Sequence, residues 1–345
     1  MASSTSPSEP RVPWLLCGLV LAALLAWAAC AFYTLRLNPE NRFLKAAALT
    51  KQTWARKMTR EHGAKHVIVG TSSCTFSIDG ERMLARHQMP LVNMGLFASI
   101  EAKPLIEWAL SEIKPGDSLI IAMEPRILSG PIRPGAHAQQ FSYLMDSPRL
   151  IGGVLEPFTP AGIDSLLALR PGGRHTVLLA GKILTRRAMF RYAIEDIHPS
   201  GWVETTATGE INGAAGGGGS VPPEGWISEG RVLLRSLAQW CKTNQVRVCY
   251  TLPVAYSSPE LWSSFRQRNA AYLLEVSQFL PVLEDRRLGA NTNASLFADT
   301  AWHFNAAGVA QRTDELAEPL RAWRMWNPDE LRFLATNGLS SSVAR

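Results

Sequence analysis

The sequence lacks the signatures of several common functional classes. It has no dinucleotide-binding glycine fingerprint and no phosphate-binding loop ending in Lys-Ser or Lys-Thr. Its seven histidines are dispersed, without the short spacings typical of zinc ligands. Lysine and arginine give a formal net charge of +6 but form no basic tract, which argues against nucleic-acid binding. We therefore predict no cofactor, no metal and no nucleic-acid partner.

Cysteine is also scarce, with five residues in 345. Cys17 and Cys30 fall inside the apolar N-terminal run, which leaves an odd number for the rest of the chain and excludes a complete disulfide framework. A Cys241–Cys249 pair stays open for an oxidising compartment. We expect these cysteines and Cys74 to be small buried hydrophobic residues instead.

Charged residues are missing between positions 12 and 35, although they make up 19% of the chain. An uncharged apolar run of this length crosses a bilayer core as a helix, and Trp14 lies where interfacial aromatic residues occur. We predict a disordered N-terminus at 1–11 and an uncleaved membrane anchor at 12–35. The run is too long for an ordinary cleaved signal peptide, and a lipoprotein site ending at Cys30 is a minor alternative.

The charges that flank this run bear on orientation. Arg11 precedes it, whereas Arg36, Arg42 and Lys45 follow it. The positive-inside bias would place the body of the protein in the cytoplasm, although long domains translocate despite such charges.

After the anchor, short β-branched runs alternate with helical patterns, which indicates βαβ units and a parallel sheet. We predict strands at 66–70, 91–93, 118–123, 246–252 and 281–283. We predict helices at 39–61, 81–87, 100–113 with Ser99 as N-cap, 177–197, 228–243 and 265–280. This organisation gives a linker helix at 36–62, an α/β domain at 63–325 with a flexible glycine-rich insertion at 199–224, and a C-terminal tail at 326–345.

The first predicted strand ends in Gly70-Thr71-Ser72, and Asp299 and His303 lie near the C-terminus. Acyl transfer needs a hydroxyl nucleophile, a base that takes its proton and a third group that orients the base. We expect Ser72 to be the nucleophile, His303 the base and Asp299 the orienting carboxylate. Ser73 is the alternative nucleophile.

These motifs resemble the SGNH (GDSL-like) hydrolase superfamily, and most closely its membrane-anchored branch associated with polysaccharide O-acetylation. The resemblance covers residues 64–124 and 245–320. It rests on Gly70-Thr71-Ser72, Asn93-Met94-Gly95, Pro115-Gly116-Asp117, and Asp299 with His303. It implies a three-layer α/β/α flavodoxin-like fold with the catalytic domain on the periplasmic or extracytoplasmic side. It also implies a glycan or acyl-ester substrate and a membrane acyl-donor protein as partner.

The resemblance also implies an oxyanion hole, for which the backbone N–H groups of Ser72, Gly95 and Ala98 are the candidates. The chain departs from the superfamily at the third block, where Glu124 stands in place of an asparagine. An ionised Glu124 would repel an oxyanion unless it is protonated, turned away or engaged in orienting another group. Asp299 and His303 are separated by three residues, where two are commoner. Asn93, Glu124 and Trp302 are candidates for contacting substrate.

We therefore expect a membrane-anchored serine acyl-ester hydrolase or O-acyltransferase acting on a cell-envelope glycan. One alternative is a non-catalytic SGNH-like membrane subunit that binds glycan or scaffolds an acylation complex. A second alternative is a cytoplasmic-facing lipid esterase.

Overall fold

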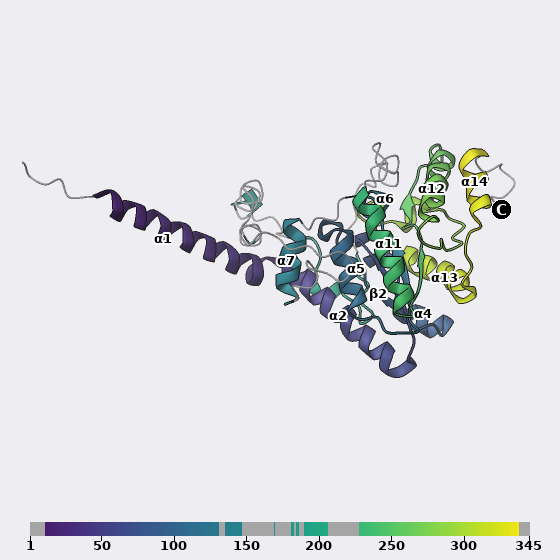
Figure 1. Ribbon diagram of the computed structural model, residues 1–345, viewed down its shortest axis with the longest axis horizontal. Coiled ribbons are helices and arrows are strands. Elements are labelled where there is room, and N and C mark those ends of the chain that lie inside the picture. The colour runs from purple at the N-terminus through teal and green to yellow at the C-terminus, as the bar shows by residue number, and fades with distance from the viewer. Residues whose placement is uncertain are drawn as a thin grey trace, which may run out of the picture.

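The protein is described by a computed structural model over residues 11–130, 135–146, 169, 181–182, 184–185, 190–205 and 228–337. In Figure 1, helix α1 projects away from a body in which helices surround a sheet. The helices up to α7 are α1 Arg11–Phe32, α2 Pro39–His62, α3 Ser72–Thr75, α4 Gly80–His87, α5 Ala102–Leu110, α6 Pro125–Leu128 and α7 Ala136–Leu144. The later helices are α11 Ser228–Thr243, α12 Trp262–Val276, α13 Ala306–Ala322 and α14 Pro328–Asn337.

The main sheet is parallel, as the alternation of strands and helices predicted. Its strands are β1 His66–Gly70, β2 Leu91–Asn93, β3 Ser118–Ala122 and β4 Arg247–Tyr250, in the order β2-β1-β3-β4. Their carboxyl ends therefore lie along one edge, where open α/β sheets place their functional loops. The predicted strand at 281–283 appears only as two isolated bridges, a parallel one between Tyr250 and Val282 and an antiparallel one between Leu283 and Met325. A second small sheet, β5 Ala255–Tyr256 with β6 Ala290–Asn291, was not predicted.

Helices cover both faces of the sheet because consecutive strand residues point to opposite sides. Val67 and Val69 belong to the larger hydrophobic core, which includes buried residues of α2, α5 and α11. Ile68 and Ile120 belong to the opposite core, which is completed by Met83 and by residues of α13. The structure is therefore an α/β fold built on a parallel sheet.

One described helical stretch, Trp14–Leu37, is long and apolar enough to cross a membrane, and it lies near the N-terminus. It ends in a short π-helix, Tyr33–Leu37, after which Asn38 caps α2 by accepting a hydrogen bond from the Glu40 N–H at 3.0 Å. The side chain of Asn41 donates to the Thr34 carbonyl at 2.8 Å. The apolar N-terminal helix therefore continues into α2 through a hydrogen-bonded junction.

Three helix predictions need correction. The helix predicted at 265–280 is α12, Trp262–Val276, which begins and ends earlier. Helix α5 begins at Ala102 after a 3₁₀ turn, Ala98–Ile100, so Ser99 is not its N-cap; Glu101, at φ 71°, precedes the helix. The helix predicted at 177–197 does not extend through its last eight residues, where the chain forms a 3₁₀ turn, Ile194–Asp196. Phe190 and Tyr192 pack into an aromatic cluster there, so tertiary packing overrides the helical periodicity.

Other predictions match well. Helix α11 has the predicted bounds, and α2 and α4 differ from prediction by one residue at an end. Cys241 and Cys249 are buried free thiols. Most of the predicted glycine-rich insertion lies outside the described residues, but 199–205 are described, and Ser200 and Val203 there are fully buried. Within the predicted tail, α14 packs against α12.

Candidate active site

The turn after β1 presents the predicted nucleophile. Gly70 is required there because a Cβ atom would lie 2.1 Å from the Ala122 carbonyl oxygen of β3 and 2.6 Å from the Cys74 Cβ of α3. The close approach of strand and helix places Ser72 at the first residue of α3, at the carboxyl edge of the sheet. Ser72 is partly exposed there.

The two neighbouring serines differ in their surroundings. Ser73 is 1% exposed, and its hydroxyl lies 3.1 Å from Thr71 Oγ1. Thr71 Oγ1 in turn donates to Glu124, at 2.5 Å from Oε1 and 2.7 Å from Oε2, so Ser73 is the donor in the first contact. The Ser72 hydroxyl makes no hydrogen bond with the part of the chain that the structure describes. Ser72 is therefore the serine whose hydroxyl is available to a substrate.

Glu124, which stands where the SGNH pattern would have an asparagine, makes a hydrogen bond within the protein. It lies just after β3 and precedes α6, and its carboxylate is engaged by the Thr71 hydroxyl. This corresponds to the expectation that Glu124 orients another group.

Asp299 and His303 meet although three residues separate them. His303 Nδ1 lies 2.9 Å from Asp299 Oδ1, and both residues are buried. An ionised carboxylate only accepts hydrogen bonds, so Nδ1 carries the proton and Nε2 is left as the basic nitrogen. His303 Nε2 has no hydrogen-bond partner among the described residues. The pair thus has the arrangement of a general base with its orienting acid.

Two residues that the sequence reasoning missed complete this pair. Tyr192 donates its hydroxyl to Asp299 Oδ2 at 2.9 Å, and Arg191 Nη1 donates to the same oxygen at 2.8 Å. The Tyr192 hydroxyl also lies 3.3 Å from His303 Nδ1. Phe190-Arg191-Tyr192 alternates aromatic and charged residues, but three residues are too few for the sequence to indicate an extended segment.

These contacts set the ionisation of Asp299. Burial by itself raises the pKa of Asp299, but its hydrogen bond to His303 and the charge of that imidazole outweigh burial, with further contributions from Arg191 and Tyr192. The pKa of Asp299 therefore lies well below its ordinary value. The carboxylate stays ionised throughout the pH range in which a histidine titrates.

An aromatic contact connects the base to the nucleophile helix. The Phe76 ring, which follows α3 directly, stacks on the His303 imidazole with centroids 4.3 Å apart and an interplanar angle of 28°. The Phe76 N–H donates to the Ser72 carbonyl at 3.0 Å. The His303 ring therefore packs one helical turn from Ser72, although no hydrogen bond joins the Ser72 hydroxyl to the imidazole.

The oxyanion-hole candidates divide into two groups. The Gly95 N–H donates to Asn93 Oδ1 at 2.9 Å and is therefore engaged. The backbone N–H groups of Ser72 and Ala98 donate to no other residue within the described ranges. The loop that leads to Ala98 lies beside the nucleophile turn, because the Leu96 N–H donates to the Gly70 carbonyl at 3.1 Å.

Asn93 and Trp302 are occupied by contacts within the protein. Asn93 is fully buried, and its side-chain amide donates to the carbonyls of Cys74 at 2.9 Å and Ile78 at 2.7 Å. It holds the segment that contains α3 against the end of β2. Trp302 is partly buried and packs against the Ala255–Phe265–Ala290 cluster.

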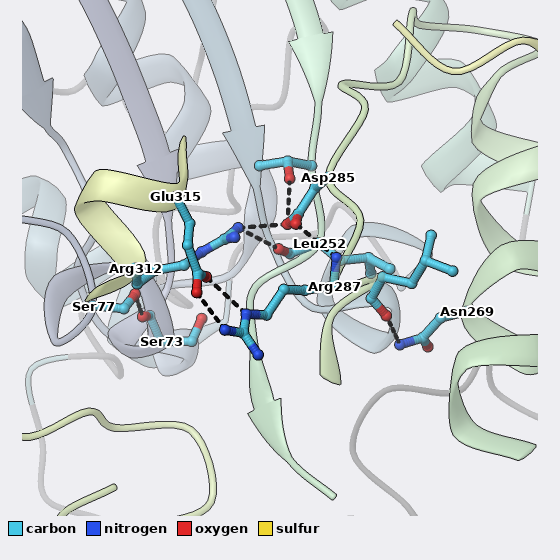
Figure 2. A network of polar contacts seen from close by, with 10 residues as sticks. Ser73, Ser77, Leu252, Asn269, Asp285, Arg287, Arg312 and Glu315 are labelled. Atoms are coloured by element: carbon cyan, nitrogen blue, oxygen red, sulfur yellow. Dashed lines mark hydrogen bonds and ion pairs between the residues drawn. The ribbon is translucent and has the colours of Figure 1, made fainter. Parts of the chain in front are cut away.

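A partly buried ionic network lies on the α13 side of the turn that follows β1. Figure 2 shows Arg312 and Glu315 extending from one helix toward Asp285 and Arg287. Arg312 Nη2 donates to Asp285 Oδ2 at 2.7 Å, and Arg287 Nε donates to Glu315 at 2.7 Å. Only the Arg312–Asp285 pair is buried, since the Arg287 and Glu315 side chains are partly exposed. A buried pair is costly to break on one side only, so Arg312 fixes α13, whose first residue follows the His303 loop, against the rest of the body.

No family model, curated protein or solved structure matched this chain. In the described part of the chain, no group of three or more His, Cys, Asp or Glu side chains could hold a metal ion.

Proposed function

We propose that the protein is a membrane-anchored serine acyl-ester hydrolase or O-acyltransferase of SGNH type, with Ser72, His303 and Asp299 as its catalytic residues. The observation that supports it best is the His303–Asp299 pair, with Nδ1 held at 2.9 Å and Nε2 free of described partners, beside the helix that begins at Ser72. A cell-envelope glycan is the proposed acceptor, and a membrane acyl-donor protein the proposed partner. An extracytoplasmic location of the domain is part of this proposal.

The proposed reaction has two half-reactions. Ser72 Oγ attacks the acyl carbonyl carbon as its proton passes to His303 Nε2, and the N–H groups of Ser72 and Ala98 stabilise the oxyanion. The C–O bond to the leaving alcohol then breaks, and Nε2 returns the proton to that alcohol. Water or a glycan hydroxyl next attacks the acyl-serine, with the same proton movements, and regenerates Ser72. The attack requires Ser72 Oγ to reach Nε2, a contact that in enzymes often tightens only with substrate present.

A non-catalytic membrane subunit that binds glycan or scaffolds an acylation complex is the second candidate. Two observations favour it. No hydrogen bond connects Ser72 with His303 in the described structure, and the Gly95 N–H is already engaged by Asn93. This candidate predicts that glycan binding survives Ser72→Ala.

A lipid esterase facing the cytoplasm is the third candidate, and the basic residues Arg36, Arg42 and Lys45 after the span favour it. A reporter enzyme fused to the C-terminus distinguishes the orientations, because activity on the extracytoplasmic side only is expected from the main proposal. Activity on the cytoplasmic side only would favour the lipid esterase.

The experiment that tests catalysis is intact-mass analysis of the full-length protein in detergent micelles after treatment with a serine-reactive fluorophosphonate. We expect one adduct that is lost in Ser72→Ala, retained in Ser73→Ala and formed much more slowly in His303→Ala. Ser73→Ala is a matched control because it removes a neighbouring hydroxyl that is buried and already engaged by Thr71. No adduct on folded protein would reject the catalytic proposal in favour of the binding subunit.

A further inference from the structure

Residues 190–205, which we term the strap, reach Asp299 from a distant part of the sequence. Arg191 and Tyr192 at its start contact Asp299. Further along, the Val203 N–H donates to the Thr75 carbonyl of α3 at 3.2 Å. The buried Nζ of Lys51, on α2, donates a hydrogen bond to the Gly201 carbonyl. The strap is thus fixed both to the nucleophile helix and to the linker helix.

Aromatic packing holds the start of the strap in place. The Tyr192 ring lies 4.8 Å from the Phe76 ring and 5.9 Å from the Phe43 ring of α2, measured between centroids. Phe190 contacts Phe43 at 5.4 Å. The packing of the Tyr192 ring against neighbouring aromatic rings therefore fixes the position of its hydroxyl next to Asp299.

The Asp299 carboxylate accepts one hydrogen bond at one oxygen and two at the other. Oδ1 faces His303 Nδ1, whereas Oδ2 accepts from both Tyr192 and Arg191. Among the described residues, Arg191 and Tyr192 are the charged or titratable groups that contact Asp299 or His303 from outside their own loop. Phe76, the contact from α3, is uncharged. The strap therefore supplies the external charge at this pair.

We propose that Arg191 and Tyr192 are positioning residues that fix the Asp299 carboxylate and, through it, set the orientation and basicity of the His303 imidazole. The proposal rests on the proposed function of this site. Tyr192 is the orienting member, because its ring is packed in the aromatic cluster and its hydroxyl donates to the carboxylate at 2.9 Å. Arg191 is the tuning member, because its side chain is about half exposed (54%) while the Asp299 side chain is almost fully buried (1%).

The sign of the Arg191 effect follows from electrostatics. The guanidinium neutralises part of the Asp299 charge that stabilises a protonated His303. Removing the cation therefore favours imidazolium and raises the pKa of His303. Because Arg191 is half exposed and screened by solvent, we expect a rise of about half a pH unit, which is roughly a threefold change in proton affinity.

The direct test is a titration of His303 by NMR on full-length protein that carries ¹⁵N-labelled histidine, with the resonance assigned by His303→Gln. Arg191→Gln is expected to raise the pKa of His303 by about half a unit, and Arg191→Lys to leave it near the wild-type value. Arg56→Gln is the matched control, because Arg56 is also exposed (67%) and pairs with the largely buried Glu112, at 2.9 Å. That control is expected to leave the His303 titration unchanged.

Kinetics of ester hydrolysis supply the second readout. The acid limb of the kcat/KM profile is expected to move upward with the NMR pKa in Arg191→Gln. Tyr192→Phe is expected to lower kcat roughly tenfold with KM within about twofold, because it removes a hydrogen bond that orients the base without touching substrate.

The two proposals fail in different ways. An unchanged His303 pKa in Arg191→Gln, or an equal shift in Arg56→Gln, would overturn the positioning role even if the wild-type enzyme is active. A shifted His303 pKa in a protein that neither hydrolyses esters nor reacts with fluorophosphonate would retain the coupling and overturn the proposed catalysis. Normal kcat in folded Tyr192→Phe would remove Tyr192 from the proposal.

Discussion

The two halves of the candidate site differ in how completely their polar groups are engaged. In the base half, His303, Asp299, Arg191 and Tyr192 form one connected set of hydrogen bonds. In the nucleophile half, the Ser72 hydroxyl has no hydrogen-bond partner among the described residues. The side-chain amide of Asn93, which lies beside it, is hydrogen-bonded to backbone carbonyls of the protein and does not face open space.

Under the proposed function, the hydrogen bonds around His303 are already formed before substrate binds. The alignment of the Ser72 hydroxyl is completed only when substrate is bound. A base with a fixed tautomer costs no reorganisation when the proton moves, which is the condition for efficient proton transfer. A hydroxyl without a partner is free to rotate, and its alignment is left to the bound acyl group. The comparison predicts that changes in the base half act on rate, whereas changes around the nucleophile turn act first on stability.

The largest expected effect is from Asp299→Asn. An amide at this position no longer holds the Nδ1–H tautomer, so we expect ester hydrolysis to fall roughly 10³- to 10⁴-fold with the fold intact. Steady-state kinetics and circular dichroism measure the two quantities. Asp314→Asn is the matched control, since Asp314 also pairs with a histidine and an arginine, His87 and Arg82, and is expected to keep full activity. If the rate of ester hydrolysis falls less than tenfold in Asp299→Asn, the prediction that changes in the base half act on rate would be wrong.

Asn93→Ala tests the nucleophile half. It leaves the carbonyls of Cys74 and Ile78 buried without their donor, so we expect the free energy of unfolding to fall by about 3 kcal/mol. Chemical unfolding in detergent micelles measures this change. Asn293→Ala, at an exposed turn, is expected to cost less than about 1 kcal/mol. Unchanged stability with a large loss of kcat would instead place Asn93 in the oxyanion hole.

The smallest expected effect is from Glu124→Gln. The new amide oxygen still accepts the Thr71 hydroxyl, so the Ser73–Thr71 chain persists and we expect kcat within about threefold of wild type. Glu124→Ala, which removes the acceptor, is expected to have the greater effect. A change in kcat above tenfold in Glu124→Gln would show that the charge of the carboxylate affects the reaction. The nucleophile half would then contribute electrostatically to catalysis.

Much of the fold could be predicted because its signals are local. The β-branched run that ends at Gly70 and the amphipathic pattern of α11 each lie within one element, and both have nearly the predicted bounds. The strap could not be predicted in this way, since its aromatic residues pack against rings from distant parts of the chain, Phe43 of α2, Phe76 after α3 and Phe97. The small β5–β6 sheet could not be predicted either, because strands of two residues are too short to show a hydrophobic pattern.

For the site, the sequence indicated the residue types and their order, Ser72, Asp299 and His303, and the structure shows that the last two meet. It did not indicate that the Asn93 amide is used within the protein or that Glu124 is engaged by Thr71. Side-chain hydrogen bonds of this kind depend on which groups packing brings within about 3 Å, and spacing along the chain does not report it.

By itself, the sequence determined the apolar anchor, the parallel α/β arrangement and the hydroxyl at the end of the first strand, because hydrophobic period and turn chemistry are written in neighbouring residues. Only the tertiary structure decided which charges surround the base. Arg191 and Tyr192 lie 108 and 107 residues from Asp299 in the chain, and packing of the strap against α2 and α3 brings them to its carboxylate.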